Sequence, residues 1–162
     1  PFYLVWKAKQ IGLSSKFIKL AENINDNRPH EVVKKIKKYL RKNKNYKKGE
    51  KILILGVAYK KNSEDTRESP ALKICSLLKL GFKNQVVICD PLVKKSIDKN
   101  FKKYNFIDIK KAQSKNFLKS LKFCLVISNH DIFDYNLISK YSKLIFDCRD
   151  SFKSKSKNII SV

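Results

Sequence analysis

The sequence lacks methionine, has little glycine and proline, and contains no long apolar run. It has 162 residues with no Met, four Gly and four Pro. Because translation begins at Met, we expect the chain to be a piece of a longer polypeptide. Apolar runs such as Ile52–Leu55 and Phe123–Ile127 are far shorter than the ~20 residues that span a bilayer. The amphipathic start, with Trp6, Lys7 and Lys9, lacks the pattern of a signal peptide, so neither a membrane span nor a leader is expected.

Cysteine and histidine are too few and too scattered for a zinc site. The four cysteines have no C-x-x-C spacing and only two histidines accompany them, so no metal is expected. Cys75, Cys89 and Cys124 lie in apolar stretches and are expected to be small buried residues. Cys148 stands beside Arg149, which favours a lowered thiol pKa, whereas a packing residue at a strand end is the simpler interpretation. Free thiols of this kind are typical of a reducing cytoplasm.

Positive charge dominates the composition, with 37 Lys and Arg against 14 Asp and Glu, a formal net charge of +23. Such a charge favours a polyanion partner, either a nucleic acid or an anionic membrane surface. However, 33 of the cations are lysines, and Lys, Asn and Ile share A/T-rich codons. The lysines also lack interleaved aromatic residues that stack on bases, so we expect no nucleic acid and no membrane as partners. The four arginines are more informative, because a guanidinium binds anions in a way that Lys cannot replace; they are Arg28, Arg41, Arg67 and Arg149.

The first 46 residues are predicted to form a helical segment. A helix over Phe2–Ile11 ends at the turn Gly12–Ser15, where Ser15 is a suitable cap for a second helix. The second helix has an apolar stripe of Phe17, Ile18, Ala21 and Ile24. Pro29 is expected to open a third helix, because proline suits the first helical turn, and this helix should end at Asn43–Gly49.

Residues 47–162 change to alternating strands and helices, which predicts an α/β fold with a Rossmann-like open parallel sheet and flanking helices. The predicted strands are Ile52–Ala58, Val86–Cys89, a minor Tyr104–Ile107, Phe123–Ser128 and Leu144–Asp147. The predicted helices are Pro70–Gly81 and Asp131–Tyr141, and the tail Ser151–Lys157 is expected to be loose. In such a sheet the binding residues gather at the carboxyl ends of the strands.

Cationic side chains follow two of these predicted strands. Tyr59 and Lys60 follow the first strand, and Arg67 comes shortly before a helix that Ser69 is suited to cap. Arg149 follows the last strand. No G-x-G-x-x-G or G-K-[ST] phosphate loop is present. The positions therefore predict that Lys60, Arg67 and Arg149 converge on one phosphate-bearing ligand.

The stretch GVAYKKNSEDTRESPALKI resembles a signature of the UDP-glucose/GDP-mannose dehydrogenase family, in its C-terminal domain. The similarity continues through CDPLV and SNHDIFDYNLISKYSKLIFDCRD, and is weakest between Lys94 and Leu121. The opening PFYLVWKAKQIGLSSKFIKLAENINDNRPHEVV resembles the central helices of the same family. Within the family, the sequence is most similar to bacterial UDP-N-acetylglucosamine 6-dehydrogenases of surface-polysaccharide synthesis.

The resemblance implies an enzyme that oxidises the C6 hydroxyl of a UDP-sugar, of the UDP-N-acetylglucosamine or UDP-glucose type, to a carboxylate with NAD as cofactor. It implies that Tyr59, Lys60 and Arg149 bind the UDP-sugar, that Arg67 contacts NAD, and that the central helices form a homodimer. It also implies that the catalytic cysteine and the NAD domain lie outside these residues, so no catalytic residue is assigned and the chain alone should be inactive. Asn129 and Cys148 depart from the family pattern. A stand-alone nucleotide-binding or interaction module without catalysis remains the alternative.

Overall fold

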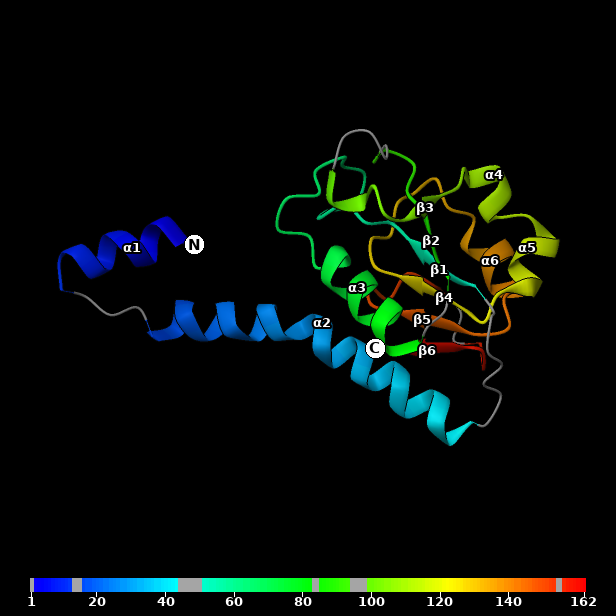
Figure 1. Cartoon of the computed structure of the whole chain (residues 1–162), viewed down its shortest axis with the longest axis horizontal. Helices are drawn as coiled ribbons and strands as arrows, with labels where there is room; N and C mark the ends of the chain where they lie inside the picture. Colours follow the sequence, from blue (N-terminus) through cyan, green and yellow to red (C-terminus); the bar gives the residue numbers. More distant parts are fainter. Residues whose placement is uncertain (1, 13–15, 44–50, 83–84, 94–98, 154–155) are drawn as a thin grey trace.

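The computed structural model describes residues 2–12, 16–43, 51–82, 85–93, 99–153 and 156–162 (Figure 1). The expected boundary between residues 46 and 47 and the expected cap Ser15 lie outside the described residues. Of the helices described, none is long and apolar enough to cross a membrane.

A parallel sheet forms the centre of the α/β domain, as predicted. Its six strands are β1 (Ile52–Leu55), β2 (Val86–Cys89), β3 (Asn105–Phe106), β4 (Phe123–Val126), β5 (Ile145–Asp147) and β6 (Ile159–Ser161). The strand order is β3-β2-β1-β4-β5-β6, and every neighbouring pair is parallel. Strands β2 and β3 therefore lie on one side of β1, and β4 to β6 lie on the other, so the strand order reverses between β1 and β4. Open α/β sheets of this order bind ligands at that point.

Helices cover both faces of the sheet (Figure 1). Two apolar clusters fill the space between the sheet and these helices, and alternate residues of β1 belong to each. Ile52 and Ile54 are in the first cluster, and Leu53 and Leu55 are in the second. The first cluster includes residues of α2 (Lys16–Lys42) and α3 (Ala71–Phe82), and the second includes residues of α5 (Lys115–Ser120) and α6 (Tyr135–Tyr141). The remaining helices are α1 (Phe2–Gln10), the short 3₁₀ helix η1 (Lys99–Phe101) and α4 (Ile109–Ala112). A strand covered on both faces has to be apolar throughout, as β1 is.

The prediction that Pro29 opens a third helix is wrong. Pro29 lies inside the single helix α2, and the helix axis bends about halfway along (Figure 1). A proline removes one backbone hydrogen bond and bends a helix, but the turns on both sides can persist. The second half of α2 is held by packing, since Val32, Val33, Ile36 and Leu40 are buried against the α/β domain.

The C-terminal end contains a strand that sequence analysis missed. Ile159–Ser161 form β6, which pairs with β5 through the register Ile145↔Ile159 to Asp147↔Ser161. This edge strand is only half-buried and follows a polar stretch, so it produces no strong apolar pattern. Residues 154 and 155 of the tail expected to be loose lie outside the described residues. Strand β1 also ends earlier than predicted, because the chain turns at Gly56 with a φ of 73°.

Candidate functional site

The exits of β1 and β4 pack closely at the point where the strand order reverses. Gly56 follows β1 in the left-handed region, and a Cβ atom there would lie 2.2 Å from the Ser128 carbonyl oxygen. Only glycine fits such an approach and such a φ. The Ser128 hydroxyl in turn donates to the Ala58 carbonyl oxygen. The loops that follow β1 and β4 are therefore in contact, and hydrogen-bonded to each other, directly after the two strands end.

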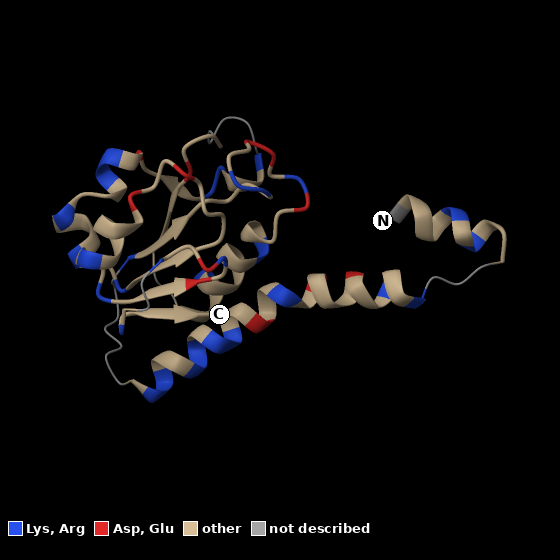
Figure 2. Ribbon diagram, turned by 180° about the vertical axis from the view of Figure 1, so that it is seen from behind, with Lys and Arg blue, Asp and Glu red and all other residues tan. Residues whose placement is uncertain are grey.

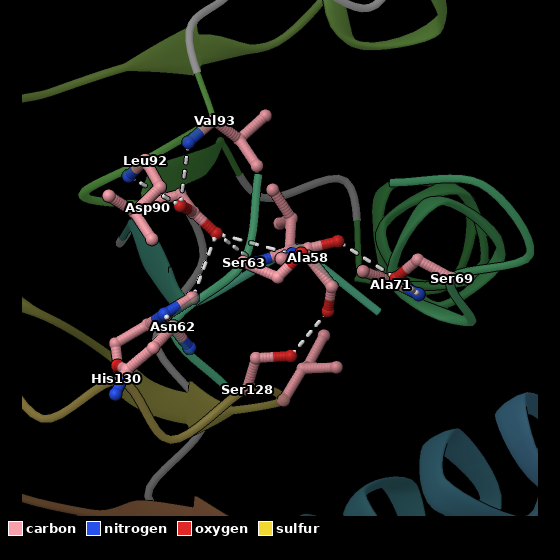
Figure 3. Close-up of polar contacts among 12 residues, drawn as sticks. Ala58, Asn62, Ser63, Ser69, Ala71, Asp90, Leu92, Val93, Ser128 and His130 are labelled. Carbon is pink, nitrogen blue, oxygen red and sulfur yellow. Dashed lines mark hydrogen bonds and ion pairs between the residues drawn. The ribbon is translucent and has the colours of Figure 1, made fainter. Parts of the chain in front are cut away.

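The Asp90 carboxylate, at the end of β2, holds these loops from the other side (Figure 3). One of its oxygens accepts hydrogen bonds from the Val57 and Ala58 amides, at 2.7 and 3.2 Å, and lies 3.3 Å from Nε2 of His130. The other oxygen accepts from the amides of Leu92 and Val93, both at 2.9 Å. Burial alone would raise the pKa of Asp90, but the bonds from His130 and the backbone amides lower it to about 2.

This arrangement decides which groups remain for a ligand. In a glycine-rich dinucleotide loop, the backbone amides after the first strand face the diphosphate. Here the Val57 and Ala58 amides already bind the Asp90 carboxylate. The Val57 and Ala58 amides are therefore not available to the diphosphate of a dinucleotide.

Tyr59 and Lys60 are the first exposed residues after β1. The Tyr59 amide donates to the Asp65 carbonyl oxygen at 2.7 Å, and the Tyr59 side chain is 45% exposed. Lys60 is exposed, and no carboxylate of the described residues lies within ion-pair distance of its ammonium group. A half-exposed ring and an exposed cation therefore stand together at the end of β1.

Arg149 stands at the end of β5, next to β4 in the sheet. Its Nε donates to the Ile127 carbonyl oxygen at 2.9 Å, and its amide donates to the buried Asp147 carboxylate at 2.9 Å. Asp147 also accepts from the amide and hydroxyl of Ser151, at 2.6 and 3.1 Å. The described part of the chain places no carboxylate within ion-pair distance of the Arg149 guanidinium. The structure thus brings Lys60 and Arg149 to the same edge, on either side of β4.

Arg67 lies in a different environment. Its Nε and one terminal nitrogen bind the two oxygens of Asp65 at 2.9 and 2.8 Å. This ion pair lowers the pKa of Asp65 to about 2 and raises that of Arg67. Arg67 also lines a cavity of about 580 Å³ whose walls do not include Tyr59, Lys60 or Arg149; the cavity residues are Glu64, Asp65, Thr66, Arg67, Glu68, Ser69, Leu72, Asn100 and Phe101. The start of α3 closes one side, where Ser69 accepts from the Ala71 amide as its N-cap, as predicted.

The cysteines provide no reactive thiol. Cys75, Cys89 and Cys124 are buried, as predicted, and burial raises the pKa of each thiol to about 12. Arg149 does act to lower the pKa of Cys148, but this effect is too small to make the thiol reactive. Burial, with a smaller contribution from Asp147, raises this pKa to about 11 and outweighs the arginines nearby. Within the described ranges, no group of His, Cys, Asp and Glu residues has the arrangement of a metal site.

Asp90 and His130 are central to the edge, although neither was predicted as a site residue from the sequence. Their side chains are 0% exposed. Their position was the available signal, because Asp90 follows a predicted apolar strand by one residue and His130 follows another by two. A buried carboxylate that organises loops cannot be distinguished by sequence position from an exposed one that caps a turn.

Comparison with known proteins gives a family match over most of this domain. Residues 53–154 match the model of the UDP-glucose/GDP-mannose dehydrogenase family, UDP binding domain. A UDP-N-acetyl-D-mannosamine dehydrogenase of Campylobacter jejuni is 38% identical over 96 residues, which are 58% of this chain and 21% of that protein.

Two solved structures show the same fold. The UDP-N-acetyl-mannosamine dehydrogenase Cap5O of Staphylococcus aureus has a TM-score of 0.66 at 25% identity, covering 91% of this chain and 33% of that one. A GDP-mannose dehydrogenase of Pseudomonas aeruginosa has a TM-score of 0.71 at 16% identity, covering 98% of this chain and 36% of that one. This chain therefore spans about a fifth to a third of the length of these proteins.

Proposed function

Because the chain belongs to the UDP-glucose/GDP-mannose dehydrogenase family, we propose that it binds the UDP moiety of a UDP-sugar. We place it as part of an NAD-dependent dehydrogenase that oxidises the C6 hydroxyl of this sugar to a carboxylate. The observation that carries the proposal is the pair Lys60 and Arg149, two cations without carboxylate partners in the described structure, at one edge of the sheet. A diphosphate is the anion that such a pair suits, because both cations can bind its oxygens at once.

Each proposed contact follows from the position of its residue. Lys60 and the terminal nitrogens of Arg149 bind the diphosphate from opposite sides of β4. The half-exposed ring of Tyr59 stacks against the sugar nucleotide. The oxidation of a C6 hydroxyl to a carboxylate releases two hydrides, which two NAD molecules would accept in succession. This chain offers NAD one cation, Arg67, beside a cavity that also holds Glu64, Asp65 and Glu68. Since the amides after β1 are occupied by Asp90, most of the NAD site has to come from elsewhere.

The names of the relatives favour N-acetylmannosamine as the sugar. The relatives described above include UDP-N-acetylmannosamine dehydrogenases of Campylobacter jejuni and Staphylococcus aureus. The motif resemblance pointed instead to UDP-N-acetylglucosamine or UDP-glucose. We therefore propose UDP-N-acetylmannosamine as substrate, ahead of those two sugars.

These 162 residues alone are expected to be inactive as a dehydrogenase. The proposed chemistry needs a thiolate that adds to the C6 aldehyde left by the first hydride transfer. All four cysteines are unsuited to this role, because burial raises each thiol pKa to about 11 or 12. A reducing cytoplasm, where these thiols stay free, is the proposed location.

Calorimetry with UDP tests the binding proposal. Lys60→Ala and Arg149→Ala each remove a charge-assisted contact of about 1.5–3 kcal/mol, so each should weaken UDP binding at least tenfold. Lys51→Ala is a matched control, because exposed Lys51 precedes β1 at the opposite edge of the sheet. The control should bind like the wild type. A folded wild-type chain that takes up no UDP, or a Lys51 variant as weak as the Lys60 variant, would refute the assignment.

We propose that the first half of α2 forms the contact between two copies of the chain in a homodimer. Phe17, Leu20 and Ile24 form one stripe there and are 81%, 57% and 57% exposed. An apolar stripe of this kind suits a second copy of the chain. Leu20→Asp should therefore convert a dimer to a monomer in sedimentation velocity. Lys19→Gln is the control, since it changes the charge equally on another face of the helix and should remain a dimer. A wild type that is monomeric at high micromolar concentration would contradict this proposal.

A further inference from the structure

Tyr59 and Lys60 lie between two anchored points of the backbone. On one side, Ala58 donates its amide to Asp90 and accepts the Ser128 hydroxyl. On the other side, the Asn62 amide donates to Nδ1 of His130 at 3.0 Å. These bonds fix the chain directly before Tyr59 and two residues after Lys60. The position of the two side chains therefore depends on both anchors.

The Asn62 anchor has a buried part and an exposed part. The buried part is the bond to His130, whose side chain is 0% exposed. The exposed part consists of a side-chain bond from Asn62 to Asp131 at 2.7 Å, its return bond from the Asp131 amide at 3.1 Å, and the ion pair of Lys61 with Asp131 at 2.6 Å. Exposed ion pairs contribute little, because water and salt screen them. The buried bond is therefore the stronger constraint.

The bonds of His130 determine where its proton lies. Nδ1 accepts the Asn62 amide, so it carries no hydrogen. The hydrogen of the neutral ring is then on Nε2, which donates to the Asp90 carboxylate at 3.3 Å. Figure 3 shows His130 next to Asn62 and below Asp90. A single ring thus connects the end of β2 with the loop that follows β1.

We propose that His130 is a positioning residue for UDP-sugar binding, acting through the Asn62 amide on Lys60 and Tyr59. The inference rests on the proposed function, since it assigns Lys60 and Tyr59 to the ligand. His130 itself does not touch the ligand. It holds the loop in a single arrangement before binding, so that less conformational entropy is lost when UDP binds.

Two variants of His130 separate its two bonds. His130→Asn places an amide oxygen near the position of Nδ1 and keeps an acceptor for Asn62. His130→Gln places an amide nitrogen near Nε2 and keeps a donor for Asp90. Both lose one buried hydrogen bond, so their losses of unfolding free energy should be similar. In calorimetry with the 162-residue chain, His130→Asn should bind UDP within threefold of wild type, and His130→Gln at least tenfold more weakly.

Asp131→Ala is the control, because it removes the exposed part of the anchor and leaves His130 in place. It should change the UDP affinity less than threefold. Equal affinities of the two His130 variants, or an Asp131 variant as weak as His130→Gln, would overturn the positioning role. If the wild type takes up no UDP, the proposed function fails, and the positioning role fails with it.

Amide hydrogen exchange tests the anchor without any ligand. The Asn62 amide should be protected in the wild type and in His130→Asn, and should exchange at least tenfold faster in His130→Gln. The wild-type measurement alone is decisive even if the variants do not fold. An unprotected Asn62 amide in a folded wild-type chain would overturn the inference, whatever the UDP affinity.

Discussion

Two carboxylates and two cations at the carboxyl edge of the sheet lie in two different layers, one buried and one exposed. The inner layer consists of the carboxylates Asp90 and Asp147, whose side chains are buried and bind backbone amides of the loops. The outer layer consists of Lys60 and Arg149, which are exposed and have no carboxylate partner among the described residues. Figure 2 shows both signs of charge near the strand ends, whereas cations predominate on the helices at the opposite side of the domain.

In these two layers, the buried carboxylates stabilise the fold, and the exposed cations are the groups available for binding. Buried carboxylates that accept several amides stabilise loop conformation, because the ionised form is strongly hydrogen-bonded. Exposed cations contribute little to stability and remain available for an anion. Asp90 and Asp147 are buried, and among the described residues neither forms an ion pair with Lys60 or Arg149. We therefore expect changes in the inner layer to reduce mainly stability, and changes in the outer layer to reduce mainly UDP affinity.

The largest expected effect is that of Asp90→Ala in the inner layer. The variant leaves the buried amides of Val57 and Val93 and the Nε2–H of His130 without their acceptor. We expect a loss of about 3–5 kcal/mol in the free energy of unfolding, measured by urea denaturation. Asp26→Ala, at an exposed site of α2, is the control and should change it by less than about 0.5 kcal/mol. A loss below about 1 kcal/mol for Asp90→Ala would contradict the division into layers.

A smaller effect is expected from acid, through the same carboxylate. The pKa of Asp90 is lowered from 3.8 to about 2 in the folded chain. Its ionised form therefore stabilises the fold above pH 4, and this stabilisation is lost as the pH falls towards 2. A pKa difference of this size corresponds to about 2 kcal/mol.

Unfolding curves at pH 5 and pH 2 measure this effect when Asp90→Asn is compared with the wild type. The wild type should lose about 2 kcal/mol more than the variant between the two pH values, since the amide does not titrate. Other carboxyl groups titrate equally in both chains and cancel in the comparison. Parallel pH profiles would show that the Asp90 carboxylate does not stabilise the inner layer through its ionised form.

The sheet could be predicted from the sequence because its strands are apolar on both faces. The predicted Val86–Cys89 is the observed β2, and the other three long strands differ only at their ends. Tertiary packing explains the errors. Pro29 remains within α2 where the following residues are buried, and Ile159–Ser161 becomes a strand only because β5 offers a free edge. Neither condition is visible in the local pattern.

The positions of the residues in the outer layer could also be predicted from the sequence, whereas those of the inner layer could not. Tyr59, Lys60 and Arg149 follow predicted strands, and parallel strands end at one edge. The network of Asp90, His130 and Asn62 joins residues 28 to 68 positions apart. Its existence depends on a ring tautomer and on a left-handed residue, Asn62 with a φ of 56°. Such contacts follow from three-dimensional packing and not from spacing along the chain.

The smallest effect is expected for Arg67, the arginine that Asp65 already pairs. It is 87% exposed, so Arg67→Ala should change the unfolding free energy by less than about 0.5 kcal/mol. Because Arg67 lines the separate cavity, its loss should also change UDP affinity less than twofold, whereas Arg149→Ala should weaken it at least tenfold. The two variants are matched, since each removes one exposed guanidinium from the strand-end loops.

The pKa of Asp65, about 2 beside Arg67, should rise towards 3.8 in the Arg67→Ala variant, which a carboxyl NMR titration measures. If Arg67→Ala weakens UDP binding as much as Arg149→Ala does, both arginines bind the same diphosphate. The ion pair with Asp65 would then not prevent Arg67 from binding the ligand.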